Sequence, residues 1–501
     1  MPTRRLFMLL AIAALALAAA PAHAATSADP WPQFQGDAGR AGFAEHAPAS
    51  PYEVAWEAST GIGDATQVSG LPIPIIAGTL AIVVGREEVA AVDIAAGTVA
   101  WTAPRALGPS SPPAVAGELL LFLEGGGDES ASASGTPSAS SSASATPSVV
   151  SGAPDASRTA TASATPAPAA TVSSVVAIDL RTRERAWTVA LSEVSHTGVL
   201  LEGGTAFVGA DDGTITAVNA TNGSERWSVD VGDHVTAPIA ASDGLVLASV
   251  RPETREAPSL VALRAADGSE AWRYGPSGTV LDLGAPSVAG DAVYLVASDS
   301  TVRAVGLGDG AERWASPLYS PSAGSPPAVS GQGVFVTDQS GTIYNFDPAS
   351  GAERWRYASN RFAVSGPIVT STALLQPTSD GTIVAVDIAS GHQVWHGSVS
   401  DSLVIGLAAS SEVVVASRTG TSPGLVGLRT DPAGLTEDVT SPTTSDPAGL
   451  LLAWLAASVP IVALAVLLGR SLYRRMGPAD LGGADVDDIV DPWESDPEDQ
   501  A

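Results

Sequence analysis

The hydrophobic positions of this chain fall in short runs that recur with a regular period. Each run has four to six residues, is rich in Val, Ile, Leu and Ala, and ends at a Gly-containing pair such as Asp212-Gly213 or Asn222-Gly223. Such runs predict β-hairpins, because tight turns need positive φ angles that Gly adopts without steric cost. Four predicted strands fill each unit of about 42 residues, and eight units run from Pro72 to about Thr430.

A Trp residue marks the last strand of seven units. Each unit carries one phrase, as in Ala385-Val-Asp-Ile-Ala-Ser-Gly-His-Gln-Val-Trp395, and successive Trp lie 86, 40, 45, 42, 41 and 40 residues apart. A period near forty residues with four strands per unit is typical of a β-propeller. The seven are Trp101, Trp187, Trp227, Trp272, Trp314, Trp355 and Trp395.

The two ends of the array complement each other. The eighth unit begins near Val404 and stops at Asp431-Pro432 without a Trp, whereas a lone strand around Trp56 precedes the first unit. If this strand completes the eighth unit, no open edge remains where the circle would part. We therefore predict an all-β fold, an eight-bladed propeller of four-stranded antiparallel blades over residues 25–430, closed by an N-terminal strand.

Three further segments place the propeller relative to a membrane. Residues 1–24 have the charged start, apolar stretch and small-residue end of a signal peptide, of either the general secretory or the twin-arginine type. Residues 450–469 predict one transmembrane helix, because about nineteen uncharged apolar residues span a layer of ~30 Å. Arg470, Arg474 and Arg475 follow at once, which indicates a cytoplasmic C-terminus. The prediction is a single-pass protein of the cell membrane with an extracytoplasmic propeller.

The remaining segments are poor in residues that build a core. A Ser/Ala/Thr/Pro tract at about 126–171 interrupts the second unit and is predicted to be disordered, as a glycosylated spike or as a tolerated hairpin-tip insertion. Residues 431–449 are interpreted as a stalk. Residues 470–501 form an acidic tail, which is either a solvated end or a docking motif for a cytoplasmic partner.

Composition excludes several classes of chemistry. The chain has 501 residues, a formal charge of −29, no Cys and no Lys. Disulfides, thiolate sites and Schiff-base catalysis are therefore excluded, and the acidity argues against nucleic acid as a partner. His392 and His396 flank a blade Trp, but this spacing on a strand separates the side chains by about 13 Å, too far for one metal ion.

The repeated phrase, the eight units and the opening Trp31-Pro-Gln-Phe-Gln-Gly…Arg40-Ala-Gly resemble the pyrroloquinoline-quinone-type propeller family. The resemblance spans about residues 30–430. It implies that the blade tryptophans dock between neighbouring blades, each burying ~200 Å². These structural positions are Trp56, Trp101, Trp187, Trp227, Trp272, Trp314, Trp355 and Trp395.

The resemblance leaves two classes of function open. Some members are dehydrogenases that bind the quinone with Ca²⁺ and commonly carry a vicinal Cys pair, while others are cofactor-free scaffolds, including the propeller lipoprotein of the bacterial outer-membrane assembly machinery. The absence of Cys favours a member without cofactor or metal. The alternative, a quinone- and Ca²⁺-dependent dehydrogenase, would take its catalytic acid from Asp64, Asp233, Asp282 or Asp401, which follow the Trp strands.

A binding scaffold is accordingly the preferred hypothesis, with no catalytic, cofactor-binding or metal-binding residue assigned. Loops from every blade gather on one face of a propeller and form a surface for a protein, peptide or glycan. Candidate contacts are the blade connections at Tyr319-Ser-Pro-Ser and Asn360-Arg361-Phe362.

Overall fold

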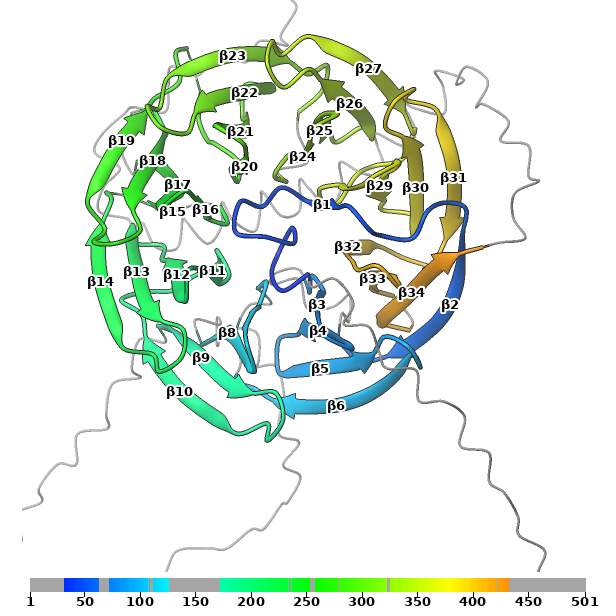
Figure 1. The fold of residues 1–501 in the computed structure, drawn as a ribbon, viewed down its shortest axis with the longest axis horizontal. Helices are drawn as coiled ribbons and strands as arrows, with labels where there is room; N and C mark the ends of the chain where they lie inside the picture. Colours follow the sequence, from blue (N-terminus) through cyan, green and yellow to red (C-terminus); the bar gives the residue numbers. More distant parts are fainter. Residues whose placement is uncertain are drawn as a thin grey trace, which may run out of the picture. The chain divides into compact units, whose positions relative to one another are not determined.

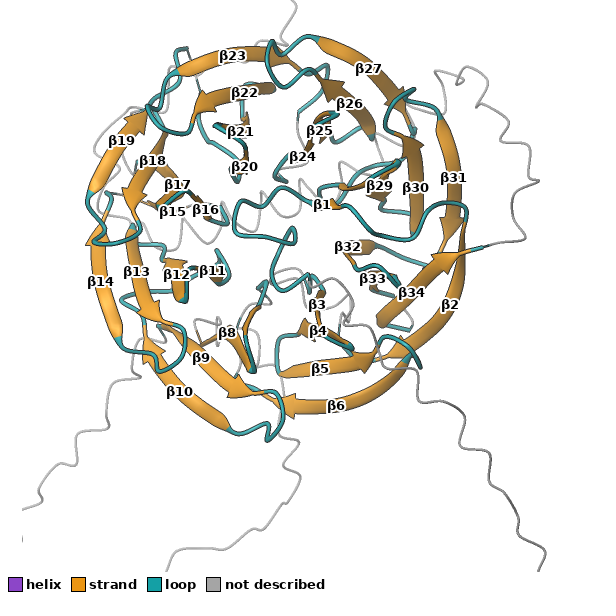
Figure 2. Cartoon of the chain, in the orientation of Figure 1, coloured by secondary structure: helices purple, strands orange, loops and turns teal. Residues whose placement is uncertain are grey.

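The structure, a computed structural model, contains only strands and loops in the part of the chain that it describes (Figure 2). That part is residues 31–62, 72–106, 108, 111–125, 172–232, 234–235, 237–252, 257–278, 280–321, 325–420 and 422–431. The predicted signal peptide, the tract at 126–171, the membrane helix at 450–469 and the acidic tail lie outside it and stay predictions. None of the described residues forms a helix with the length and hydropathy to cross a membrane.

Eight sheets stand around one axis like the blades of a wheel (Figure 1). Blade 1 is β3 (Ile75–Ala77), β4 (Leu80–Val84), β5 (Glu88–Asp93) and β6 (Thr98–Pro104). Blade 2 is β7 (Ala114–Ala116), β8 (Leu119–Gly125), β9 (Ser173–Asp179) and β10 (Arg185–Ala190). Blade 3 is β11 (Leu200–Glu202), β12 (Thr205–Gly209), β13 (Thr214–Asn219) and β14 (Glu225–Asp230). Blade 4 is β16 (Ala240–Ser242), β17 (Leu245–Arg251), β18 (Ser259–Arg264) and β19 (Glu270–Tyr274), with β15 (His234–Val235) also on β17.

The other four blades repeat this order from axis to rim. Blade 5 is β20 (Ser287–Ala289), β21 (Ala292–Ala297), β22 (Thr301–Gly306) and β23 (Glu312–Pro317). Blade 6 is β24 (Ala328–Ser330), β25 (Gly333–Thr337), β26 (Thr342–Phe346) and β27 (Glu353–Ala358). Blade 7 is β28 (Ile368–Thr370), β29 (Ala373–Pro377), β30 (Thr382–Asp387) and β31 (Gln393–Ser398), joined by β1 (Phe43–Ala44). Blade 8 is β32 (Val404–Ala409), β33 (Val414–Arg418), β34 (Gly424–Thr430) and, as its outer strand, β2 (Tyr52–Ser59).

The predicted ring closure is confirmed. Strand β2 pairs antiparallel with β34, with Trp56 opposite Gly427 and Ala58 opposite Leu425. The N-terminal strand thus completes the blade whose other three strands end the propeller. The all-β, eight-bladed, four-stranded architecture predicted from the period is confirmed as well.

The pattern of apolar and polar residues differs between the strands of a blade because the strands are buried to different degrees. The second strand of blade 5, Ala292–Ala297, is buried at every position, because both of its faces meet other blades. The outer strand of blade 6, Glu353–Ala358, alternates between exposed and half-buried positions, because one of its faces meets solvent. The core therefore consists of the slabs between neighbouring blades.

The N-terminal residues 31–44, here called the axial segment, cross the centre of the ring (dark blue in Figure 1). They follow the innermost strands from blade to blade. Trp31 exchanges two backbone hydrogen bonds with Ile76 of blade 1, and the Gln33 side chain bonds the backbone of Leu201 in blade 3. Backbone amides of four further inner strands donate to this segment: Ala241 to Ala38, Val288 to Gly39, Val329 to Ala41 and Val369 to Gly42.

Arg40 anchors the axial segment. Its side chain is fully buried, its Nε donates to the Ile239 carbonyl at 2.8 Å, and its Nη1 donates to the Phe34 carbonyl at 3.0 Å. Burial lowers the pKa of Arg40 to about 9, so the guanidinium still carries its charge at neutral pH. The opening motif therefore builds the centre of the ring.

Candidate functional site

The repeated phrase forms one contact between two blades. The indole N–H of Trp56, Trp227, Trp272, Trp314 or Trp355 donates to a backbone carbonyl in the next blade at 2.8–2.9 Å. The acceptor lies three residues before the Gly of that blade's phrase. A Cβ on this Gly would meet the side chain of the same Trp at 2.2–2.8 Å. The Trp of one blade and the Gly of the next are thus two halves of one joint.

Three joints depart from this pattern. Arg183 replaces the Gly that would face Trp101 and keeps the left-handed backbone at φ 63°. The Nε1 atoms of Trp101 and Trp187 are buried and find no acceptor among the described residues. Trp395 packs edge-on against Tyr52 of the N-terminal strand, with ring centroids 5.2 Å apart.

The Asp of the phrase supports the turn that carries the Gly. The Asp347 carboxylate accepts hydrogen bonds from the amides of Ala349 and Ser350, and Asp93 does the same for Ala95 and Ala96. Bonds from the Ser350 hydroxyl and amide, and then from Arg354, lower the pKa of Asp347 to about 2. These acids therefore stabilise turns.

The joint between blades 4 and 5 also contains a buried ion cluster. Arg303 is 5% exposed and its guanidinium binds Asp299 at 2.5 Å and Glu312 at 2.9 Å. The Tyr274 hydroxyl of blade 4 donates to the same Glu312 carboxylate. Burial, and then this bond, raise the pKa of Tyr274 to about 12. The cluster therefore joins two blades.

One face of the ring carries the segments that join each outer strand to the next blade, and we call it the connection face. Among the described residues, three large apolar side chains are exposed on it: Leu281 (73%), Tyr319 (75%) and Leu403 (37%). They belong to the connections between blades 4 and 5, 5 and 6, and 7 and 8. We call these three side chains the apolar arc. Because loops held in place by a rigid scaffold often carry binding residues, their connections are candidates for an interaction surface.

Tyr319 is the most exposed of these three side chains. Its ring stacks on Tyr344, which stacks in turn on Phe346, with centroids 6.4 and 5.9 Å apart. The guanidinium of Arg356 lies over the Tyr319 ring at 4.2 Å. Tyr and Arg are the residue types most enriched where interfaces bind most strongly.

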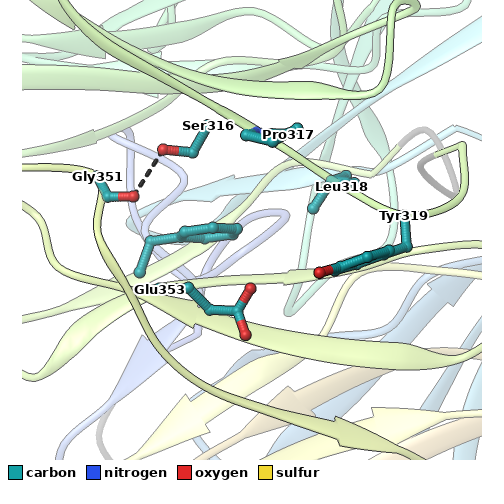
Figure 3. A pocket seen from close by; sticks show the side chains of 7 residues that line it. Ser316, Pro317, Leu318, Tyr319, Gly351 and Glu353 are labelled. Carbon is teal, nitrogen blue, oxygen red and sulfur yellow. Dashed lines mark hydrogen bonds between the residues drawn. The ribbon is translucent and has the colours of Figure 1, made fainter.

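A groove of about 260 Å³ runs beside Tyr319 between blades 5 and 6 (Figure 3). Ser316, Leu318 and Tyr319 form one wall, and Glu353 rises from the other. The volume lies below the ~300–1,000 Å³ of ordinary cofactor and small-molecule sites. A groove of this volume can hold one or two side chains of a partner.

The structure places the second predicted loop beside this arc. Asn360 is exposed, Phe362 is half-buried, and Arg361 forms an ion pair with Asp380 and donates to Thr382 at 3.1 Å. Leu281 and Leu403 were not among the predicted contacts, and only their place in a connection distinguishes them from strand residues.

The candidate acids and histidines do not gather. Asp282 pairs with Arg251 at 3.4 Å, and Asp401 lies beside Gly420 in another connection; Asp64 and Asp233 are outside the described residues. Within the described ranges, no three His, Asp or Glu side chains are placed to hold a metal ion.

Two histidines from successive connections contact Asp211, which lies in the hairpin between β12 and β13 of blade 3. His196 Nδ1 bonds the Asp211 carboxylate at 3.2 Å, and His234 Nδ1 bonds the Asp211 carbonyl. The bond from Asp211 raises the pKa of His196.

Comparisons with known proteins agree with this geometry. The outer membrane protein assembly factor BamB of Shewanella oneidensis is 25% identical over 122 residues, which are 24% of this chain. The match spans only 30% of that relative's length. Among solved structures, a europium-containing methanol dehydrogenase aligns with a TM-score of 0.59 at 13% identity, covering 80% of this chain and 90% of the other. The quinohemoprotein alcohol dehydrogenase of Comamonas testosteroni aligns with a TM-score of 0.59 at 12% identity, covering 84% of each chain.

Identities this low show a shared fold and nothing about activity. The sequence profile described as outer membrane protein assembly factor BamB matches residues 171–326 and 298–432. These matches cover just over half of the chain, and the chain therefore belongs to this family of quinone-type-repeat β-propellers.

Proposed function

We propose that this protein is a non-catalytic propeller that binds a protein partner through its connection face. The observation that carries the proposal is the arc of Leu281, Tyr319 and Leu403, exposed on connections that the ring holds in place. The matching family is described as an assembly factor. This description supports a protein, in preference to a peptide or glycan, as the partner.

The dehydrogenase alternative fits the residues poorly. A quinone with Ca²⁺ needs several carboxylate or amide oxygens close together, since Ca²⁺ takes 6–8 oxygen ligands. The residues that begin the inner strands near the axis include Pro112, Pro327 and Pro367, which are neutral and buried. The described acids form no cluster there, and the chain has no Cys. We therefore derive no catalytic step through a quinone.

Site-specific photo-cross-linking tests the proposed surface. A benzophenone amino acid replaces Leu281, Tyr319 or Leu403 in the full-length protein, and Asn222 serves as a control on the opposite face, where it is exposed in the turn before an outer strand. We expect the same adduct from the three connection-face positions and none from Asn222. Adducts of equal yield from Asn222, or none from the arc, would contradict the proposal.

A second experiment tests catalysis directly. The purified protein is incubated with the quinone and Ca²⁺ and then assayed for dye-linked alcohol oxidation. We expect no rate above that of the quinone alone. A rate that depends on the protein would contradict the scaffold proposal and support the dehydrogenase alternative.

The proposed location follows from the sequence and from the family. We propose an extracytoplasmic propeller at the bacterial membrane, anchored by the helix at 450–469 with the tail 470–501 inside the cell. The family's described association with an outer membrane supports the extracytoplasmic part. Protease treatment of intact spheroplasts should remove the propeller and spare an epitope tag placed at the C-terminus; loss of the tag would exclude this orientation.

A further inference from the structure

Two of the eight blades share a short sequence that the others lack. Blade 4 reads Glu270-Ala-Trp-Arg273 and blade 6 reads Glu353-Arg-Trp-Arg356. After the blade Trp, the other six have Glu57, Thr102, Thr188, Ser228, Ala315 and His396. In both blades the Arg pairs with its own Glu three residues earlier, at 2.9 and 2.8 Å.

Both arginines also reach the preceding blade. Arg273 donates through Nη2 to the Val231 carbonyl of the connection after blade 3, at 3.0 Å. Arg356 lies over the Tyr319 ring of the connection after blade 5. Their side chains are 37% and 42% exposed, so each guanidinium lies at the rim of a joint and meets solvent.

A cavity adjoins each of these two joints. The cavity between blades 3 and 4 holds about 380 Å³ and is lined by Val231, Val250, Pro252 and Pro258, with Arg273 and Ser259 as its polar groups. The described residues supply acceptors for three of the five Arg273 N–H groups: Ser259, Val231 and Glu270. The other two N–H groups have no acceptor among the residues that the structure describes.

The cavity between blades 5 and 6 is the Tyr319 groove of Figure 3. Phe346 and Leu318 form part of its walls. Glu353, the ion-pair partner of Arg356, also lines it. The Arg273 guanidinium lines the first cavity, and the Arg356 guanidinium adjoins the second by covering the ring of Tyr319, which lines it. We call the two cavities the arginine slots.

We propose that the two arginine slots bind acidic side chains that neighbour apolar residues in extended segments of the protein partner. This inference rests on the proposed function and names the chemistry of the partner. A guanidinium bonds a carboxylate strongly and directionally, and volumes of 260 and 380 Å³ admit an apolar side chain beside it.

The test uses a defined peptide in place of the partner. The probe is fluorescein-labelled, amide-capped Ala-Glu-Leu-Pro-Ala, and its matched control replaces Glu with Gln. Binding to the full-length protein is followed by fluorescence anisotropy at low salt. We expect the Glu peptide to bind at least about tenfold more tightly than the Gln peptide, and to weaken as salt is raised.

Variants assign the binding to the slots. Arg273→Met combined with Arg356→Met should weaken the Glu peptide about tenfold or more, and each single variant should remove part of the binding. Arg273→Lys and Arg356→Lys keep the charge and should retain part of the affinity, which separates a lost ligand contact from a damaged joint. Arg226→Met removes an exposed outer-strand arginine outside both slots and should change nothing.

Three results would overturn the inference: equal binding of the Glu and Gln peptides, no binding of the Glu peptide up to about 5 mM, or equal losses in Arg226→Met and the double variant. The cross-linking at Tyr319 and Leu281 reports on the proposed function separately. Adducts there without peptide selectivity would leave the docking face intact and remove only the acidic-segment chemistry.

Discussion

The joint between Trp and Gly makes a quantitative prediction in blade 5, where two glycines can be compared. Gly310 carries the phrase and has φ +68°, and a Cβ on it would lie 2.6 Å from Cε3 of Trp272. Gly290 has φ +60° in the first turn of the same blade, and a Cβ on it would meet nothing within 4 Å. The substitutions Gly310→Ala and Gly290→Ala therefore share the backbone cost and differ in the contact with the indole.

The magnitudes follow from these two terms. A left-handed Ala costs about 1–2 kcal/mol, partly offset because Ala also restricts the unfolded chain, and this applies to both variants. Overpacking against the indole adds about 1–3 kcal/mol in Gly310→Ala. If the ring shifts, the 2.8 Å bond from Trp272 Nε1 to the Leu307 carbonyl is also lost, for about 1 kcal/mol more. We expect Gly310→Ala to be less stable than Gly290→Ala by about 2–4 kcal/mol.

Thermal unfolding followed by circular dichroism, and urea unfolding followed by Trp fluorescence, measure this difference. In a protein of this size it should appear as a melting temperature lower by a few degrees, on the order of 3 °C or more. Equal melting temperatures in the two variants, or a lower one for Gly290→Ala, would show that the glycines serve the turn alone and that the indole does not press on the next blade.

Three further predictions concern other joints. Arg183→Gly should raise the free energy of unfolding by about 1 kcal/mol, because Gly adopts φ 63° without strain; a lower thermal midpoint would contradict this. Arg303→Met should lower it by about 3 kcal/mol in urea titrations, because two carboxylates lose their buried cation, whereas Arg313→Met loses an exposed pair and should cost less than about 1 kcal/mol. The pKa of Tyr274 is raised to about 12, so the folded state keeps the phenol proton and stability should fall as the pH rises from about 10 to 12; Tyr274→Phe should flatten this fall in urea midpoints measured at each pH.

The blade architecture could be predicted because short stretches of sequence determine each hairpin. Each hairpin has its own apolar run and Gly-containing turn, and each phrase repeats them at a constant spacing. The closure by Trp56 could be predicted for a related reason: the last unit lacks an outer strand and the first is preceded by a spare one. These features depend on residue type, which a sequence displays directly.

The course of the axial segment could not be predicted in the same way. Its bonds to Ala241, Val288, Val329 and Val369 join backbone groups, and backbone groups are the same in every residue. The inner strands that receive it are only three residues long, too short for a periodic signal. Arg40 is fully buried, and a charged side chain is rarely buried unless it is paired, but nothing in the sequence alone marked this residue as buried.

The candidate surface was predicted in part, and the reason is again physical. Tyr319 lies in a polar Ser/Pro connection, where an aromatic residue has no strand to join, and it proves to be 75% exposed. Leu281 lies in Val280-Leu-Asp-Leu283, an apolar stretch broken by one Asp that equally fits a buried strand. Exposure of such a Leu depends on how its connection leaves the blade, which no local pattern encodes.

At the seam of the ring, the N-terminal strand β2 contributes side-chain contacts to the neighbouring blades in addition to its pairing with β34. At the joint of blades 7 and 8 the turn that would face Trp395 does not exist, because the chain leaves at Asp431 and the fourth strand comes from the N-terminus. Tyr52 takes that place: its ring packs against Trp395 and its hydroxyl donates to the Pro48 carbonyl at 2.8 Å. At the joint of blades 8 and 1, Trp56 donates to the Ile94 carbonyl, to which Arg429 also donates. One strand thus supplies the side chains of two joints, so its register on β34 decides whether both neighbouring blades are held, and a slip of one residue would turn Tyr52 and Trp56 away from both.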